Sequence, residues 1–199
     1  LCMRCHTGTY PNSPKIDPPT HTHHKLNGEG GQCVNCHMPQ TTYMQRDLRR
    51  DHGFTIPDPL LTKEHGIPNA CNRCHTDKDT DWAIAAVEKW YGPRMNRPSR
   101  KRTQWIAKAR EGAAGSRENL LQLLKEEKTP FWKAVATELL YPWALDPEVT
   151  TTLLGNLSHT NALLRGTTAR AMDPVARRGE TRIDTALGKL LDDPVRKVR

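Results

Sequence analysis

Three copies of the pattern Cys-x-x-Cys-His, at residues 2–6, 33–37 and 71–75, use all six cysteines of this chain. Two thiols three positions apart can form thioether bonds to the two vinyl groups of one haem, and the histidine that follows can bind the haem iron. The spacing therefore predicts three covalently attached haems. The attachment residues are Cys2, Cys5, Cys33, Cys36, Cys71 and Cys74, and the proximal iron ligands are His6, His37 and His75.

Two other uses of paired cysteines explain the pattern less well. A closed zinc site takes four ligands, commonly two Cys-x-x-Cys pairs, and three pairs do not divide into such sites. A disulfide framework would not place every cysteine in a pair that is followed directly by histidine. Haem attachment is the interpretation that accounts for the cysteines and the histidines together.

Each haem iron needs a second axial ligand if it is to be six-coordinate, and histidine is the commonest choice in a histidine-rich chain. Methionine is the competing ligand, and Met44 stays open as an alternative, whereas Met38 follows a proximal histidine and cannot reach back over the same iron. We predict bis-histidine coordination, and interpret His159 as a surface or capped residue that is not a ligand. The remaining histidines are His21, His23, His24, His52 and His65.

The segment that must position these residues is poor in large aliphatic side chains. Residues 1–79 are rich in Pro, Gly, Thr and Asn, too polar for an ordinary side-chain core. Covalently held porphyrins would supply the missing apolar mass, so we expect loops and short helices wrapped around haems. The motifs begin 31 and 38 residues apart, which keeps the haems close enough for rapid electron transfer.

From residue 80 onward the chain has helical patterns. Asp81 is predicted to cap a helix that ends at Gly92, a second helix is predicted over residues 100–110, and a third should begin at Ser116. Residues 130–136, 162–168 and 194–199 align with a period of 32 residues, and the last segment is interpreted as a helix cut short soon after its start.

Two-helix units of this length stack into a solenoid, because neither helix can bury its apolar stripe alone. We therefore predict HEAT-like repeats in this part, with an irregular helical bundle as the alternative. The repeats contain no metal or nucleophile constellation and are interpreted as a packing or docking surface.

Charge also divides the chain. Most of the net charge of +8 lies after residue 80, and seven basic residues follow one another without an acid between them. Haem propionates would make the first part acidic, so this basic segment is expected to meet propionates or an acidic partner. A nucleic-acid partner is disfavoured because no recognition motif accompanies the charge. The seven residues are Arg94, Arg97, Arg100, Lys101, Arg102, Lys108 and Arg110.

Several motifs together resemble a known family. Cys-His-Met-Pro at residues 36–39, Arg-Asp-His-Gly-Phe at 50–54, Pro-Asn-Ala-Cys at 68–71 and Trp-Tyr-Gly at 90–92 are similar to those of periplasmic or extracellular multihaem c-type cytochromes related to the tetrahaem cytochromes of nitrifiers. The resemblance covers about the first 92 residues, and members are often fused to tetratricopeptide or HEAT-like helical repeats.

The resemblance implies which histidines are distal ligands. Carried over by position they are His21, His24 and His52, with His23 and His65 in reserve; which of them serves which haem stays open. The family also carries further haem motifs upstream, so we expect more than three haems in the whole protein. Haem is attached outside the cytoplasm, so we expect a precursor with an export signal. The chain is expected to be a fragment, with a processed product as the alternative.

We therefore predict a mainly α protein: a loop-rich multihaem cytochrome c domain with short helices (1–93), a basic helical connector (94–115) and an α-solenoid of HEAT-like repeats truncated at its end (116–199). It should transfer electrons in the periplasm or outside the cell, without being an enzyme. The expected partners are redox proteins or other subunits of a complex or filament, with no membrane span in this segment. The alternative is a subunit of a multihaem oxidoreductase that acts on small nitrogen compounds at one open haem.

Overall fold

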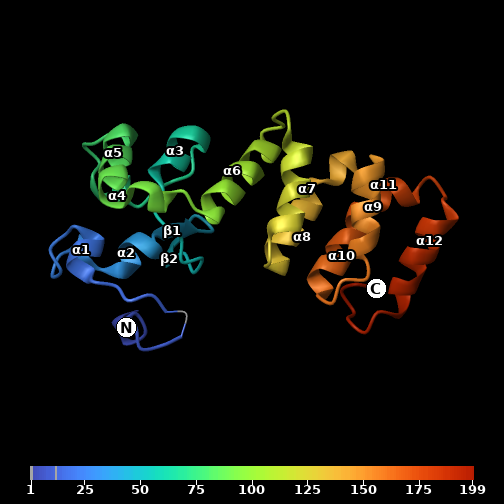
Figure 1. Cartoon of the computed structure of the whole chain (residues 1–199), viewed down its shortest axis with the longest axis horizontal. Coiled ribbons are helices and arrows are strands. Elements are labelled where there is room, and N and C mark those ends of the chain that lie inside the picture. Colours follow the sequence, from blue (N-terminus) through green and yellow to red (C-terminus); the bar gives the residue numbers. More distant parts are fainter. Residues whose placement is uncertain (1, 12) are drawn as a thin grey trace. The chain divides into compact units, whose positions relative to one another are not determined.

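The computed structural model describes residues 2–11 and 13–199 and is mainly helical, as predicted (Figure 1). Backbone contacts divide the chain into two compact units, Leu1–Asn96 and Arg97–Arg199. The division into three parts made from the sequence stays a prediction. Within the described ranges, no helix combines the length and the apolar character that crossing a membrane requires.

The first unit consists of short helices and loops, which is the architecture expected of a chain without an ordinary core. Its only described strands form one hairpin, which the sequence analysis did not predict. In order along the chain, the elements are η1 (Cys2–Arg4), α1 (Pro18–Thr22), η2 (Glu29–Gly31), α2 (Cys33–His37), β1 (Gln40–Tyr43), β2 (Asp47–Arg50), α3 (Pro59–His65), α4 (Cys71–Cys74), α5 (Thr80–Tyr91) and η3 (Gly92–Met95).

The hairpin pairs β1 with β2 in antiparallel register, from Gln40 opposite Arg50 to Tyr43 opposite Asp47. Its turn places Met44 and Gln45 in the left-handed region, with φ of 48° and 61°. Nearly every strand residue is exposed, so the sequence lacks the alternation of apolar and polar residues by which a half-buried strand is recognised.

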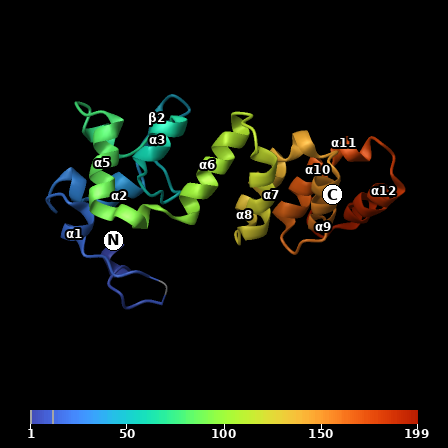
Figure 2. The same ribbon diagram turned by 45° about the horizontal axis from the view of Figure 1, so that its top comes forward.

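Helix α5 is the longest element of the first unit, and its cap differs from the prediction. Asp79, not Asp81, accepts a hydrogen bond from the Trp82 backbone N–H at 2.7 Å. Asp81 instead pairs with Lys63 of α3 at 2.6 Å. Helices α3 and α5 lie side by side in both views (Figures 1 and 2), so α5 is held at its N-terminal end by a cap and by its neighbour.

The second unit is a set of amphipathic helices. The helix predicted over residues 100–110 begins slightly earlier, at Pro98, whereas the predicted start at Ser116 is confirmed. The elements are α6 (Pro98–Arg110), α7 (Ser116–Glu126), α8 (Pro130–Leu139), η4 (Tyr141–Trp143), α9 (Pro147–Asn156), α10 (Ala162–Ala171), α11 (Asp173–Ala176), α12 (Thr181–Gly188) and η5 (Lys189–Asp192).

Helix pairs appear where the 32-residue period was found. Helix α7 packs against α8, α9 packs against α10, and α8 and α10 pack against each other (Figure 1). The third copy differs from the prediction, because residues 194–198 form bends and a turn instead of a helix. Val198 is buried there and lies against Gly166 of α10, so this segment adds to the core of the second unit.

The apolar core of the described residues lies in the second unit. It includes Leu120, Leu153, Leu164 and Ile183, whose side chains are fully buried. In the first unit the buried apolar residues lie from residue 59 onward. The segment that carries the first two Cys-x-x-Cys-His motifs therefore has no side-chain core of its own.

Candidate functional site

Each Cys-x-x-Cys-His motif folds as a single helical turn. The motifs fall on η1, α2 and α4, and in two of them the histidine N–H bonds back to the first cysteine, from His6 to Cys2 at 3.1 Å and from His75 to Cys71 at 3.0 Å. Residues three apart on a helical turn share one face. Both thiols of each motif can therefore reach one planar group, and no disulfide joins any of the six cysteines.

Side chains from elsewhere hold the second and third turns in place. The Arg50 guanidinium, at the end of β2, donates hydrogen bonds to the carbonyls of Val34 and Met38 at 3.0 and 3.1 Å. The buried Asn69 side chain accepts the backbone N–H of Cys71 at 2.9 Å. The hairpin and the Pro-Asn-Ala segment thus act as supports for the cysteine motifs.

Thiols of successive motifs are close enough to influence one another. Burial raises the pKa of Cys36, and the neighbouring Cys74 thiol raises it further. Burial likewise raises the pKa of Cys33, to which Cys2 of the first motif adds by charge and by a hydrogen bond. Groups attached at the three motifs would therefore be neighbours.

Two proximal histidines face histidines of the 20–24 segment. The ring centroids of His21 and His37 are 5.9 Å apart, with planes 15° from parallel, and those of His24 and His75 are 6.0 Å apart at 45°. Two imidazoles that bind one metal ion from opposite sides, each through a bond of roughly 2 Å, have centroids about 6 Å apart. Each pair has the separation that one haem iron between the rings requires.

Hydrogen bonds to Nδ1 leave the other ring nitrogen, Nε2, of these histidines available to bind a metal. His37 donates its Nδ1 hydrogen to the Thr55 carbonyl at 2.9 Å, and His24 donates its own to the Thr22 carbonyl at 2.5 Å. In the first motif, His6 likewise donates its Nδ1 hydrogen to the Pro14 carbonyl at 3.2 Å. Such a bond fixes the tautomer in which Nε2 carries the lone pair, which is the form that binds a metal.

His21 is also held in its neutral form. Partial burial lowers the pKa of its imidazole, and the nearby His37, Arg94, His23 and His6 lower it further. A neutral ring keeps a lone pair free for a metal at neutral pH.

The residues present fit haem better than a bare metal ion. Among residues 2–11 and 13–199, no three side chains of His, Cys, Asp or Glu are arranged to hold an ion, so the described chain forms no four-ligand zinc site. The first unit exposes large apolar side chains that would pack against an apolar plane. They include Tyr10, Leu26, Tyr43, Met44, Leu48, Phe54, Ile56 and Trp82.

The other candidate ligands have different surroundings. His23 stacks on Trp90, with centroids 4.4 Å apart and planes 9° from parallel. His52 has an exposed side chain in the loop after β2, and the His65 side chain is nearly buried at the end of α3, 3.8 Å from Glu64. Met44, the alternative ligand, is at the hairpin tip and 75% exposed.

Three aromatic residues belong to the site without having been assigned a role from the sequence. Trp82 lies 4.8 Å from the ring of His75, and Trp90 and Tyr91 contact the 21–24 segment. Gly30 also belongs to it, because the His24 ring lies against its Cα. Trp90 and Tyr91 belong to the Trp-Tyr-Gly motif at residues 90–92, but which histidines they touch depends on tertiary structure.

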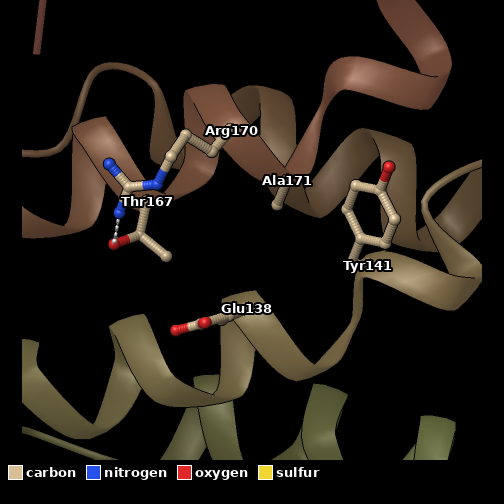
Figure 3. A pocket seen from close by; sticks show the side chains of 5 residues that line it. All are labelled: Glu138, Tyr141, Thr167, Arg170 and Ala171. Carbon is tan, nitrogen blue, oxygen red and sulfur yellow. Dashed lines mark hydrogen bonds between the residues drawn. The ribbon is translucent and has the colours of Figure 1, made fainter.

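The second unit contains surface features of another kind. Part of the basic segment is used internally, since Lys101 pairs with Glu126 at 2.9 Å and Arg102 with Glu127 at 2.8 Å. An open hollow of about 390 Å³ lies between α8 and α10 (Figure 3) and contains neither cysteine nor histidine. Its lining residues are Glu138, Tyr141, Thr167, Arg170 and Ala171.

His159 makes a hydrogen bond beside the start of α10. Its Nδ1 accepts the backbone N–H of Asn161 at 3.0 Å, immediately before α10. This residue serves the second unit's fold and has no part in the histidine pairs of the first unit.

Comparison with protein families gives a match. The family model described as cytochrome c552 matches residues 20–140, more than half of the chain. The matched range includes the second and third Cys-x-x-Cys-His motifs and both histidine pairs, while the first motif precedes it. Neither the curated proteins nor the solved structures contain a match.

The match and the site agree on the chemistry. Paired thiols on single helical turns, histidines beside them and an apolar surface without a core are what covalent haem attachment needs. The chain therefore belongs to the cytochrome c552 family, and it is a multihaem c-type cytochrome that carries electrons on covalently bound haem iron.

Proposed function

We propose that this chain conducts electrons through three bis-histidine haems. The haem at residues 33–37 is ligated by His37 and His21, and the haem at residues 71–75 by His75 and His24. The observation that supports this assignment is the separation of the two ring pairs, 5.9 and 6.0 Å.

His52 is proposed as the distal ligand of the third haem, opposite His6. The resemblance supports His52 only as a distal ligand, and its place opposite His6 follows from assigning His21 and His24 to the other two haems. The exposed side chain of His52 is free to turn toward a haem. His65 is the reserve for the same position, and its side chain would have to leave a nearly buried site to serve there.

The ligand pairs suit electron transfer better than catalysis. An iron with two axial imidazoles has no open position for a substrate, so it gains and loses an electron without making or breaking a bond. The Nδ1 hydrogen bonds of His24 and His37 hold both rings in the same tautomer and orientation in either oxidation state. In this function the protein holds the axial histidines in a fixed orientation.

Two haems share one short segment of chain. His21 and His24 are three residues apart, so their Cα atoms are separated by at most about 11 Å. Since each residue faces a different proximal histidine, the haems of the second and third motifs are neighbours. Electrons would pass between them over a short distance.

The second unit is proposed to be a docking module of HEAT-like repeats. The helix pairs α7 with α8 and α9 with α10 support this assignment. Lys108 and Arg110, exposed in the last turn of α6, provide positive charge for an acidic redox protein or a neighbouring subunit. We place the protein in the periplasm or outside the cell, because covalent haem attachment occurs on exported chains.

The ligand assignment can be tested by opening one iron at a time. In the haem-loaded protein, His21→Ala should make the haem at residues 33–37 high-spin and able to bind carbon monoxide, and His24→Ala should do the same at residues 71–75. The site is identified by removing that haem: the effect of His21→Ala should disappear when Cys33→Ser and Cys36→Ser are added, and should persist when Cys71→Ser and Cys74→Ser are added instead. The opposite pattern would reverse the pairing.

The same measurement on the unaltered protein separates the two proposed functions. A carrier with every iron six-coordinate should remain low-spin and bind carbon monoxide slowly. Rapid binding of carbon monoxide would point to an open iron and to the alternative, a subunit of a multihaem oxidoreductase that acts on small nitrogen compounds. Intact-mass measurement should show three haem additions.

A further inference from the structure

We propose that the C-terminal end of α5 is a clamp for the two distal histidines, formed by Trp90 and Tyr91 acting on the turn at His23. In this proposal His23 is a positioning residue and not an iron ligand. The inference rests on the proposed ligation by His21 and His24, and it adds the part of the chain that sets their direction.

The backbone at His23 separates the two ligands. His23 has φ 55° and ψ 23°, in the left-handed region, and its N–H bonds to the Pro19 carbonyl at 3.2 Å, which ends α1. This conformation is unusual for a residue other than glycine, and it persists only where the surroundings hold it. Because the chain changes direction here, His21 and His24 face different proximal histidines.

Trp90 contacts the turn from one side. Its indole stacks on the His23 ring at 4.4 Å, with planes 9° from parallel, and meets the His24 ring edge-on at 6.2 Å and 77°. Both are favourable arrangements of flat rings. One side chain therefore fixes the residue at the turn and restricts the ligand after it.

Tyr91 contacts the other distal histidine, His21. Its hydroxyl donates a hydrogen bond to the His21 carbonyl, and its ring lies 6.0 Å from the His21 ring and 5.9 Å from the His23 ring. The two consecutive residues of α5 thus touch all three histidines of the segment. His21 and His24 each face a proximal histidine, whereas His23 faces Trp90.

Helix α5 is anchored by a cap and by buried contacts, whereas the turn is exposed. The helix is capped by Asp79, buries Ala83 and Val87 and packs against α3. Residues 23–27 are exposed throughout, and α1 buries none of its residues. The direction of the distal ligands is therefore supplied by α5.

His23→Phe tests whether His23 is a ligand or a positioning residue. Phenylalanine keeps a flat ring for Trp90 and cannot bind iron, so the haem-loaded variant should keep the low-spin spectrum of the unaltered protein. His23→Ala removes the stack and should speed carbon monoxide binding at the reduced haems. An iron that becomes high-spin in His23→Phe would overturn the proposal, because His23 would then be a ligand.

Trp90→Leu and Tyr91→Phe test the clamp itself, with Trp105→Leu and Tyr141→Phe in the second unit as matched controls. Trp90→Leu should bind carbon monoxide about tenfold faster than the unaltered protein, the change expected on loss of an aromatic pair. Tyr91→Phe should shift the reduction potential of the haem that pairs with His21 and leave the other potentials unchanged. Both controls should leave rates and potentials unaltered.

The outcomes separate this proposal from the proposed function. If the unaltered protein is low-spin and Trp90→Leu behaves like Trp105→Leu in rate, spectrum and potential, the clamp is refuted while bis-histidine ligation stands. If the unaltered protein itself binds carbon monoxide rapidly at the haems of the second and third motifs, both proposals fail before any substitution is made.

Discussion

Replacing Gly30 with alanine should dislodge His24 from the haem iron that we propose it binds. A Cβ built on Gly30 would lie 2.3 Å from His24 Cδ2, 2.6 Å from Cγ and 3.0 Å from Cβ, whereas ordinary contacts begin at 3.4 Å. The imidazole must therefore retreat by about 1.1 Å, which is large beside a metal–nitrogen bond of roughly 2 Å. The crowded atoms include the His24 Cβ, which does not move when the ring rotates, so ring rotation alone does not relieve the clash.

The change should affect one haem only. In Gly30→Ala the haem at residues 71–75 should lose its sixth ligand and become partly high-spin in the oxidised state, and the reduced protein should bind a single equivalent of carbon monoxide. The haem paired with His21 should keep its low-spin signal. Electron paramagnetic resonance of the oxidised protein and carbon monoxide titration of the reduced protein measure the two effects.

Gly28→Ala is the matched control. A Cβ at Gly28 would meet only the Lys25 carbonyl oxygen at 3.4 Å, an ordinary contact, and Gly28 has a φ of −94°, which any residue adopts. Both substitutions reduce the freedom of the unfolded chain equally. If Gly30→Ala matches Gly28→Ala in spin state and carbon monoxide binding, then either His24 does not bind iron or its ring does not rest on Gly30, and our reasoning is wrong.

Three further predictions concern stability. Asp79→Ala should lower the free energy of unfolding of the haem unit by about 1 kcal/mol in a urea titration, because the Trp82 N–H loses its cap. Leu153→Ala should destabilise the second unit by about 3 kcal/mol by leaving a cavity, and the haem spectrum should stay unchanged; a changed spectrum would contradict the independence of the two cores. Arg165 holds the pKa of Asp193 below its ordinary value through hydrogen bonds of 2.7 and 2.9 Å, so the folded state binds the proton less readily than the unfolded one. This stabilisation is complete above the ordinary carboxyl pKa of about 4 and is lost as the pH falls below it, so Asp193→Asn should flatten the fall in melting temperature over that acidic range.

Local signals in the sequence were sufficient for part of the fold. Ser116 begins a helix as predicted, and the haem motifs could be recognised because their chemistry depends on residues close together in the chain. The cap of α5 was placed two residues too late, since Asp79 and Asp81 are both suitable caps and only the contact of Asp81 with Lys63 distinguishes them. Sequence patterns do not contain that contact.

The pairing of histidines could not be predicted for the same reason. The sequence gathers three histidines in residues 21–24, but which of them faces His37, His75 or Trp90 follows from how the chain turns at His23. The hairpin was missed because its strands are exposed on both faces and its role is to bring Arg50 to the carbonyls of Val34 and Met38. Such support roles leave little trace in hydrophobic periodicity.

The unequal distribution of apolar side chains has a consequence for biosynthesis. The second unit buries its own leucines, so we expect it to fold without haem, whereas the first unit, which buries few apolar side chains, should gain apolar mass when haem is attached. The ribosome makes the first unit earlier, so the order of folding should be the reverse of the order of synthesis. In a cell short of haem, new chains should therefore have a folded C-terminal unit and an unstructured N-terminal unit. Proteases should cleave the unstructured unit.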